Sequence, residues 1–87
     1  RLGNESPIHD TSGSAQRFRL LAQLRLGPVD TFTAMGALNI CRPGARIAEL
    51  RAAGHTIQTQ RITMIDDHGR EHHGIALYYL TSAMRGA

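Results

Sequence analysis

The chain has 87 residues, of which 41% are hydrophobic and 5% aromatic, and its formal net charge is +3. This length fits one small domain. The hydrophobic share excludes a disordered chain, and the few aromatic residues argue against single-strand binding by base stacking. No apolar run could span a bilayer, and no signal-peptide pattern is present. The single cysteine, Cys41, excludes an intrachain disulfide. We therefore expect a cytoplasmic protein without a membrane role.

The first residues carry no periodic pattern. Residues 1–13 contain Gly, Pro, Ser and Asn, which predicts a flexible N-terminal tail. The chain begins with Arg1 rather than Met, as a fragment or a trimmed chain would.

A first helix is expected to begin near Ser12 or Ser14, either of which can cap it, and to end near Leu26. Gly27, in a left-handed conformation, and Pro28 would end it. Its expected apolar stripe consists of Phe18, Leu20, Leu21 and Leu24. The polar side chains expected on the opposite face are Gln16, Arg19 and Gln23.

A second, short helix is predicted over Phe32–Leu38, capped by Asp30 or Thr31. Asn39 can adopt the left-handed conformation that ends it. Ile40 would then point inward, with Cys41 as a small core residue. Residues 39–41 make a tight turn of the length that a helix-turn-helix needs.

A third helix is expected to begin at Pro43 and to end at Gly54. At 100° per residue, one face carries Pro43, Ile47 and Leu50. The other face carries small and charged residues, which are Arg42, Ala45, Arg46, Glu49 and Ala52.

A β-hairpin follows. The β-branched run 57–65 and the run 72–81 predict two strands, joined by a turn at residues 66–70. Because Ile57 is out of phase with Ile62 and Met64, we expect a bulge or bend near Thr59–Arg61. The domain would therefore span residues 14–81, with residues 82–87 as a frayed end.

Charge is unevenly distributed. Residues 11–65 hold seven arginines and two acids, a balance of +5, whereas residues 66–74 hold one arginine and three acids, a balance of −2. A basic helical half fits a polyanionic partner, while the expected hairpin tip is acidic.

The run TFTAMGALNICRPGARIAEL (31–50), followed by RAAGHTI and later by YYL (78–80), resembles a family of small winged helix-turn-helix proteins of phages and bacteria. The resemblance covers about residues 16–81 and implies an α+β fold with three helices followed by a two-stranded antiparallel β-hairpin wing. Two departures are Asn39, where a Gly is usual, and the acidic wing tip, where a DNA-contacting wing is usually basic.

In such a fold, helix 43–53 would enter the major groove of duplex DNA. Arg42 and Arg46 are one turn apart, so each could bind a guanine edge or a phosphate. The alternative is that both are solvated, with Arg46 paired to Glu49. The candidate DNA-binding residues are Arg42, Gly44, Ala45, Arg46, Glu49 and Arg61.

Other arginines have less distinct roles. Arg51 is expected to be structural, with its head on a backbone carbonyl or an acid. Arg17, Arg19 and Arg25 could touch the flanking DNA backbone, although exposed helical arginines are more often solvated charges.

The sequence contains no pattern that indicates an enzyme, so we expect no catalytic activity. Cys41 has no adjacent base, and the glycines form no phosphate-binding loop. The residues His68, His72 and His73 lie near three acids, but their spacing matches no metal motif, so we expect neither a metal nor another cofactor.

Two functions stay open. The first is a phage or bacterial transcription regulator, or an accessory factor in another DNA transaction, associated with the nucleoid. The alternative is a winged helix used for protein association, because fold alone does not decide function. A homodimer is compatible with both.

Overall fold

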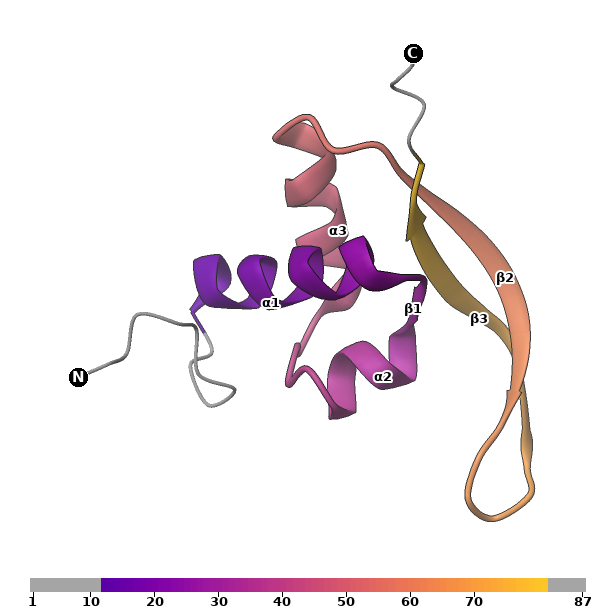
Figure 1. The fold of residues 1–87 in the computed structure, drawn as a ribbon. Coiled ribbons are helices and arrows are strands. Elements are labelled where there is room, and N and C mark those ends of the chain that lie inside the picture. Colours follow the sequence, from indigo (N-terminus) through magenta and orange to yellow (C-terminus); the bar gives the residue numbers. More distant parts are fainter. Residues whose placement is uncertain (1–11, 82–87) are drawn as a thin grey trace.

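The computed structural model describes residues 12–81, so residues 1–11 of the expected tail and the expected frayed end at 82–87 lie outside the described residues. The elements are α1 (Gly13–Leu26), β1 (Val29–Asp30), α2 (Thr31–Gly36), α3 (Pro43–Ala52), β2 (Ile57–Ile65) and β3 (Glu71–Leu80). The helices gather on one side of the sheet, and the β2–β3 hairpin extends beyond them (Figure 1). The expected α+β order of three helices followed by a hairpin is confirmed.

The sheet has one strand more than expected. Its order is β1-β3-β2, with both pairings antiparallel and Val29 opposite Tyr78. The two-stranded prediction was incomplete because β1 has two residues, too few for an alternating pattern to show. β3 is consequently the central strand.

Helix α1 begins at Gly13, where the hydroxyl of Ser12 accepts a hydrogen bond from the Ala15 amide at 3.2 Å. The predicted end at Leu26 is confirmed, but Gly27 is extended (φ 163°) rather than left-handed. The predicted stripe was partly wrong, since Phe18 is 59% exposed, whereas the polar side chains of Gln16 and Arg19 are buried.

Helix α2 is shorter than expected and ends at Gly36. Asp30 caps it by accepting a hydrogen bond from the Thr33 amide at 2.9 Å. Asn39 adopts the expected left-handed conformation (φ 54°), and Ile40 is fully buried. Cys41 is exposed rather than part of the core, because the chain turns outward after Ile40 to enter α3.

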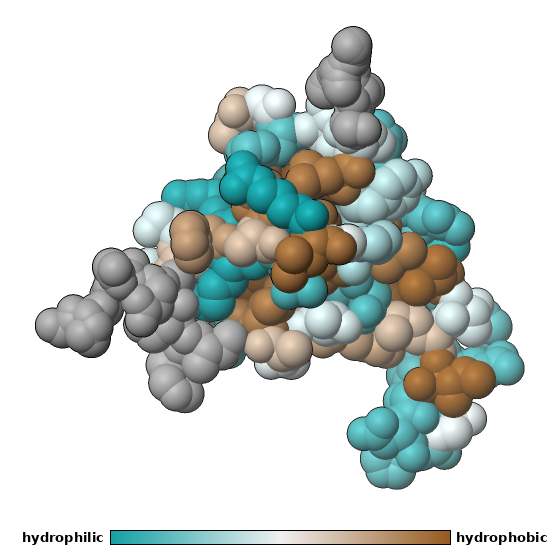
Figure 2. All heavy atoms as spheres, in the orientation of Figure 1, coloured by the Kyte–Doolittle hydropathy of each residue, from teal (hydrophilic) through white to brown (hydrophobic). Residues whose placement is uncertain are grey.

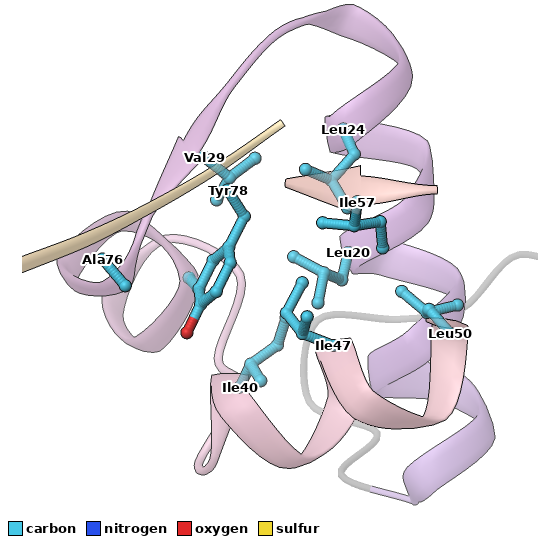
Figure 3. Close-up of a cluster of buried hydrophobic side chains, with 10 residues drawn as sticks. Leu20, Leu24, Val29, Ile40, Ile47, Leu50, Ile57, Ala76 and Tyr78 are labelled. Carbon is cyan, nitrogen blue, oxygen red and sulfur yellow. The ribbon is translucent and has the colours of Figure 1, made fainter. Parts of the chain in front are cut away.

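The core lies where the three helices meet the sheet (Figure 3). Its largest fully buried side chains are Leu20, Ile40, Ile47 and Val29. The Tyr78 ring of β3 lies among them, which joins the central strand to the helices. Helix α3 ends at Ala52, two residues before the expected Gly54, and Gly54 follows with φ 108°.

The β2–β3 hairpin contains a bulge, but not near Thr59–Arg61. Ile62 and Met64 are two positions apart on β2, whereas their partners Ile75 and His72 are three positions apart on β3. The extra residue is therefore on the second strand, where Gly74 has a φ of 70°. Glycine adopts this conformation without steric cost, which explains why the strand bends there.

Candidate nucleic-acid interface

Helix α3 presents small side chains to solvent. The predicted inner face of Pro43, Ile47 and Leu50 is confirmed, since all three are buried. The outward positions are Gly44, Ala48 and Ala52, which are exposed, and Ala45, which is half-buried. Gly44 has no side chain, and Ala48 and Ala52 carry only a methyl group, so a partner can approach the helix backbone at these positions.

Arg42 stands at the N-terminal end of this surface. It is the residue before the first turn of α3, it is exposed, and its side chain makes no capping hydrogen bond. Within residues 12–81 its guanidinium has no hydrogen bond or ion pair. Of the two arginines singled out from the sequence, Arg42 is therefore the one whose donors are available to a ligand.

Arg46 is instead paired. Its Nη2 lies 2.8 Å from Oε2 of Glu49, while Nη1 of Arg17 in α1 lies 2.8 Å from Oε1. The hydrogen bond from Arg17, together with the charge of Arg46, holds the pKa of the Glu49 carboxyl below its usual value. The alternative in which Arg46 pairs with Glu49 is thus present in the structure. Arg17 of α1 is a second partner of Glu49, which could not be predicted from the spacing of residues within α3.

Two buried polar residues of α1, Gln16 and Arg19, hold the turn before α3, although both were predicted on the opposite, polar face of α1. Arg19 donates from Nε to the carbonyl oxygen of Leu38 at 2.8 Å and from Nη2 to that of Asn39 at 3.2 Å. The side-chain oxygen of Gln16 accepts a hydrogen bond from the Cys41 amide at 3.3 Å. The line Gln16, Leu20, Leu24, at a spacing of four residues, was the signal for the buried side of this helix.

Arg51 and Arg61 lie beside the sheet. Arg51 donates to the carbonyl oxygen of Ile57 and to the hydroxyl of Thr59, both at 2.9 Å, which confirms its expected structural role. Arg61 is exposed, and its Nη1 lies 3.2 Å from the carbonyl oxygen of Gly74. Because Arg61 is opposite the buried Ala76, it lies on the side of the sheet that faces the helices.

The wing tip is held together by Asp66. Its Oδ1 accepts hydrogen bonds from the amides of His68 and Arg70, and its Oδ2 lies 2.8 Å from Nε2 of His72. These contacts, the one with His72 foremost, lower the pKa of Asp66 to about 2. Phe32 of α2 meets the His72 ring edge to face at 5.2 Å, which links the wing to the helices.

Between residues 12 and 81, no three or more His, Cys, Asp or Glu side chains are grouped to hold an ion. In the same part of the chain, no helix has the length and apolar character needed to cross a membrane.

The family comparison covers most of the chain. A family model described as "Winged helix-turn-helix domain" matches residues 15–83, which include nearly all of α1 and every later element. Comparisons with curated proteins and with solved structures gave no match. Domains of this type are typically DNA-binding modules without enzymatic activity. The helices, the left-handed turn at Asn39 and the hairpin agree with that match, and the chain belongs to the winged helix-turn-helix domain family.

Proposed function

We propose that this domain, over residues 14–81, binds duplex DNA with α3 in the major groove. It would act as a transcription regulator or as an accessory factor in another DNA transaction, in a phage or in the nucleoid of a bacterium. The proposal rests on the surface of α3, where Arg42 and Arg46 lie beside a ridge of small residues. The ridge consists of Gly44, Ala45, Ala48 and Ala52. No catalytic role is proposed.

The ridge suits close approach to DNA. The major groove, about 12 Å wide, admits an α-helix, and small outward residues let the helix backbone lie deep in it. Arg42, at the N-terminal end of α3, would reach base edges or the adjoining phosphates. Arg46, with Glu49 beside it, and the small residues Gly44 and Ala45 complete the proposed contact surface on the helix.

The wing would contact DNA near its base rather than at its tip. Arg61 lies on the helix-facing side of the sheet, where a duplex lying along α3 would pass. The tip carries the acids Asp66, Asp67 and Glu71 against Arg70 alone, so it would be repelled by phosphates. We therefore infer a contact between Arg61 and the DNA backbone, with the tip pointing away from the duplex.

The test is to measure binding of a labelled random-sequence duplex by fluorescence anisotropy at salt concentrations between about 50 mM and 200 mM. Steep weakening with salt supports phosphate contacts. The double variant Arg42→Ala/Arg46→Ala should bind about tenfold more weakly or worse, with the salt slope reduced by about 2. The double variant Arg25→Ala/Arg70→Ala has the same net charge but lies off the surface of α3, so it should lose only the smaller part of the affinity that comes from long-range attraction. Equal loss in both variants would contradict the proposed face.

A second candidate function is protein association. Phe18 and Leu26 of α1 are 59% and 82% exposed, and hydrophobic side chains lie among hydrophilic ones over this helix (Figure 2). Absence of duplex binding even at low salt, with a molecular mass that rises with protein concentration in sedimentation, would favour this function. Phe18→Ser/Leu26→Ser should then return the protein to a monomer.

A further inference from the structure

One carboxylate is shared by two arginines at the junction of α1 and α3. Each oxygen of Glu49 receives one guanidinium at 2.8 Å, Oε1 that of Arg17 and Oε2 that of Arg46. Two arginines that converge on separate oxygens of one anion form the arrangement by which proteins also bind a phosphate group. The side chains of Arg17, Glu49 and Arg46 are 37%, 41% and 19% exposed, so all three reach solvent at this place.

The positive charge of this cluster is only partly neutralised. Two guanidiniums face one carboxylate, and Nε of Arg46 is buried without a hydrogen-bond partner among the described residues. A Cβ atom at Gly13 would lie 3.2 Å from Nη1 of Arg17 and 3.5 Å from Nη1 of Arg46. Both guanidiniums therefore lie close to the first turn of α1, the end of the helix that carries partial positive charge.

We propose that Glu49 is an internal competitor of a DNA backbone phosphate, and this rests on the proposed function. In the free domain its carboxylate holds Arg17 and Arg46 together. In the complex a phosphate takes these two guanidiniums, and Glu49 must yield them. Binding that phosphate requires the ion pairs of Glu49 with Arg17 and Arg46 to break. Glu49 therefore weakens sequence-independent binding to DNA.

This competition has a directional consequence. Replacing Glu49 by the isosteric Gln removes the competing charge and leaves both arginines to the duplex. Affinity should rise by about tenfold at about 50 mM salt, and the salt slope should become steeper by about 1, the change expected for the one phosphate that the two arginines share. A carboxylate that merely positioned the arginines for DNA would give the opposite result on removal.

The experiment compares the parent, Glu49→Gln and Asp67→Asn in the random-duplex assay over a salt series. Asp67→Asn makes the same change in net charge at the wing tip, so it controls for long-range attraction. The double variants Arg17→Met/Glu49→Gln and Arg46→Met/Glu49→Gln should lose the gain. Glu49→Ala, whose fold is checked by circular dichroism, repeats the test should the Gln variant be misfolded.

The outcomes separate the two proposals. The competition is supported if the parent binds the duplex and Glu49→Gln binds it more tightly and with a steeper dependence on salt than the parent does. Parent binding with a Glu49→Gln variant that is weaker, or no different from Asp67→Asn, overturns it and leaves the proposed function standing. Absence of duplex binding by the parent and by both Glu49 variants overturns the proposed function and this inference together.

Discussion

The Nε atom of Arg19 lies 2.8 Å from the carbonyl oxygen of Leu38, so a side chain of α1 holds the turn that leads into α3. The same guanidinium reaches the carbonyl of Asn39, and only 7% of the residue is exposed. Buried carbonyl groups need donors, and here a distant arginine supplies them. The turn into α3 therefore depends on a side chain that belongs to another helix.

Replacing Arg19 by Met keeps much of the side-chain volume and removes these donors. The carbonyls of Leu38 and Asn39 would lose them, so we expect a loss of about 1–3 kcal/mol in the free energy of unfolding. Urea denaturation measures it. Arg25→Ala, at an exposed position of the same helix, should change that free energy by less than about 0.5 kcal/mol. Equal effects of the two variants would show that the hydrogen bonds do not hold the turn.

The inner face of α3 depends on Ile47, which is 1% exposed. Ile47→Ala would leave a cavity in the core between the helices and the sheet, at a cost of about 2–5 kcal/mol. Ala52→Ser, on the outward side, should stay within about 0.5 kcal/mol. Thermal unfolding of both variants checks the assignment of the two faces. A small effect at Ile47 would mean that α3 is rotated from the orientation described above.

Two glycines should respond to alanine in opposite directions. Gly74 has a φ of 70°, so Gly74→Ala forces a strained conformation that costs about 1–2 kcal/mol. Gly36 is helical, and a Cβ there would meet no atom within 4 Å. Gly36→Ala should therefore stabilise the domain by about 0.4–1 kcal/mol. Chemical denaturation of the pair tests the bulge, and a neutral Gly74→Ala would argue against it.

The Asp66 carboxyl should titrate well below the ordinary range of an aspartate. Its pKa in the folded domain is about 2 against 3.8 ordinarily, so its stabilising contribution is present above about pH 4 and is lost as the pH falls through about 2. The amide resonances of His68 and Arg70, which donate to Asp66, should shift with a midpoint near pH 2. A midpoint near the ordinary value would contradict the hydrogen-bonded turn. Asp66→Asn should remove the transition.

Strong local signals made part of the fold predictable. Pro43 at a helix start, Asn39 before a buried Ile40, and the β-branched run of β2 each act through the conformation of their own backbone. Helix α3 and the hairpin were therefore found within a few residues of their bounds. The ion pair of Arg46 with Glu49 was foreseen as an alternative because it joins neighbouring turns of one helix.

The features of the fold that were not predicted from the sequence depend on contacts between distant segments of the chain. The buried side of α1 was misjudged because Gln16 and Arg19 satisfy backbone groups more than 15 residues away, and hydrophobic periodicity counts such residues as exposed. Arg17 was missed as a partner of Glu49 for the same reason, since 32 residues separate them. Strand β1 has two residues and forms only where β3 offers an edge.

The position of β3 between β1 and β2 also bears on how the domain forms during synthesis. Among residues 12–81, β3 is the last strand and the one that pairs with both other strands, and its Tyr78 lies in the core. A nascent chain that ends before this strand holds two strands without a partner. A ribosome must therefore release residues up to about Leu80 before the sheet can close, and shorter chains would present unpaired edges to chaperones and proteases.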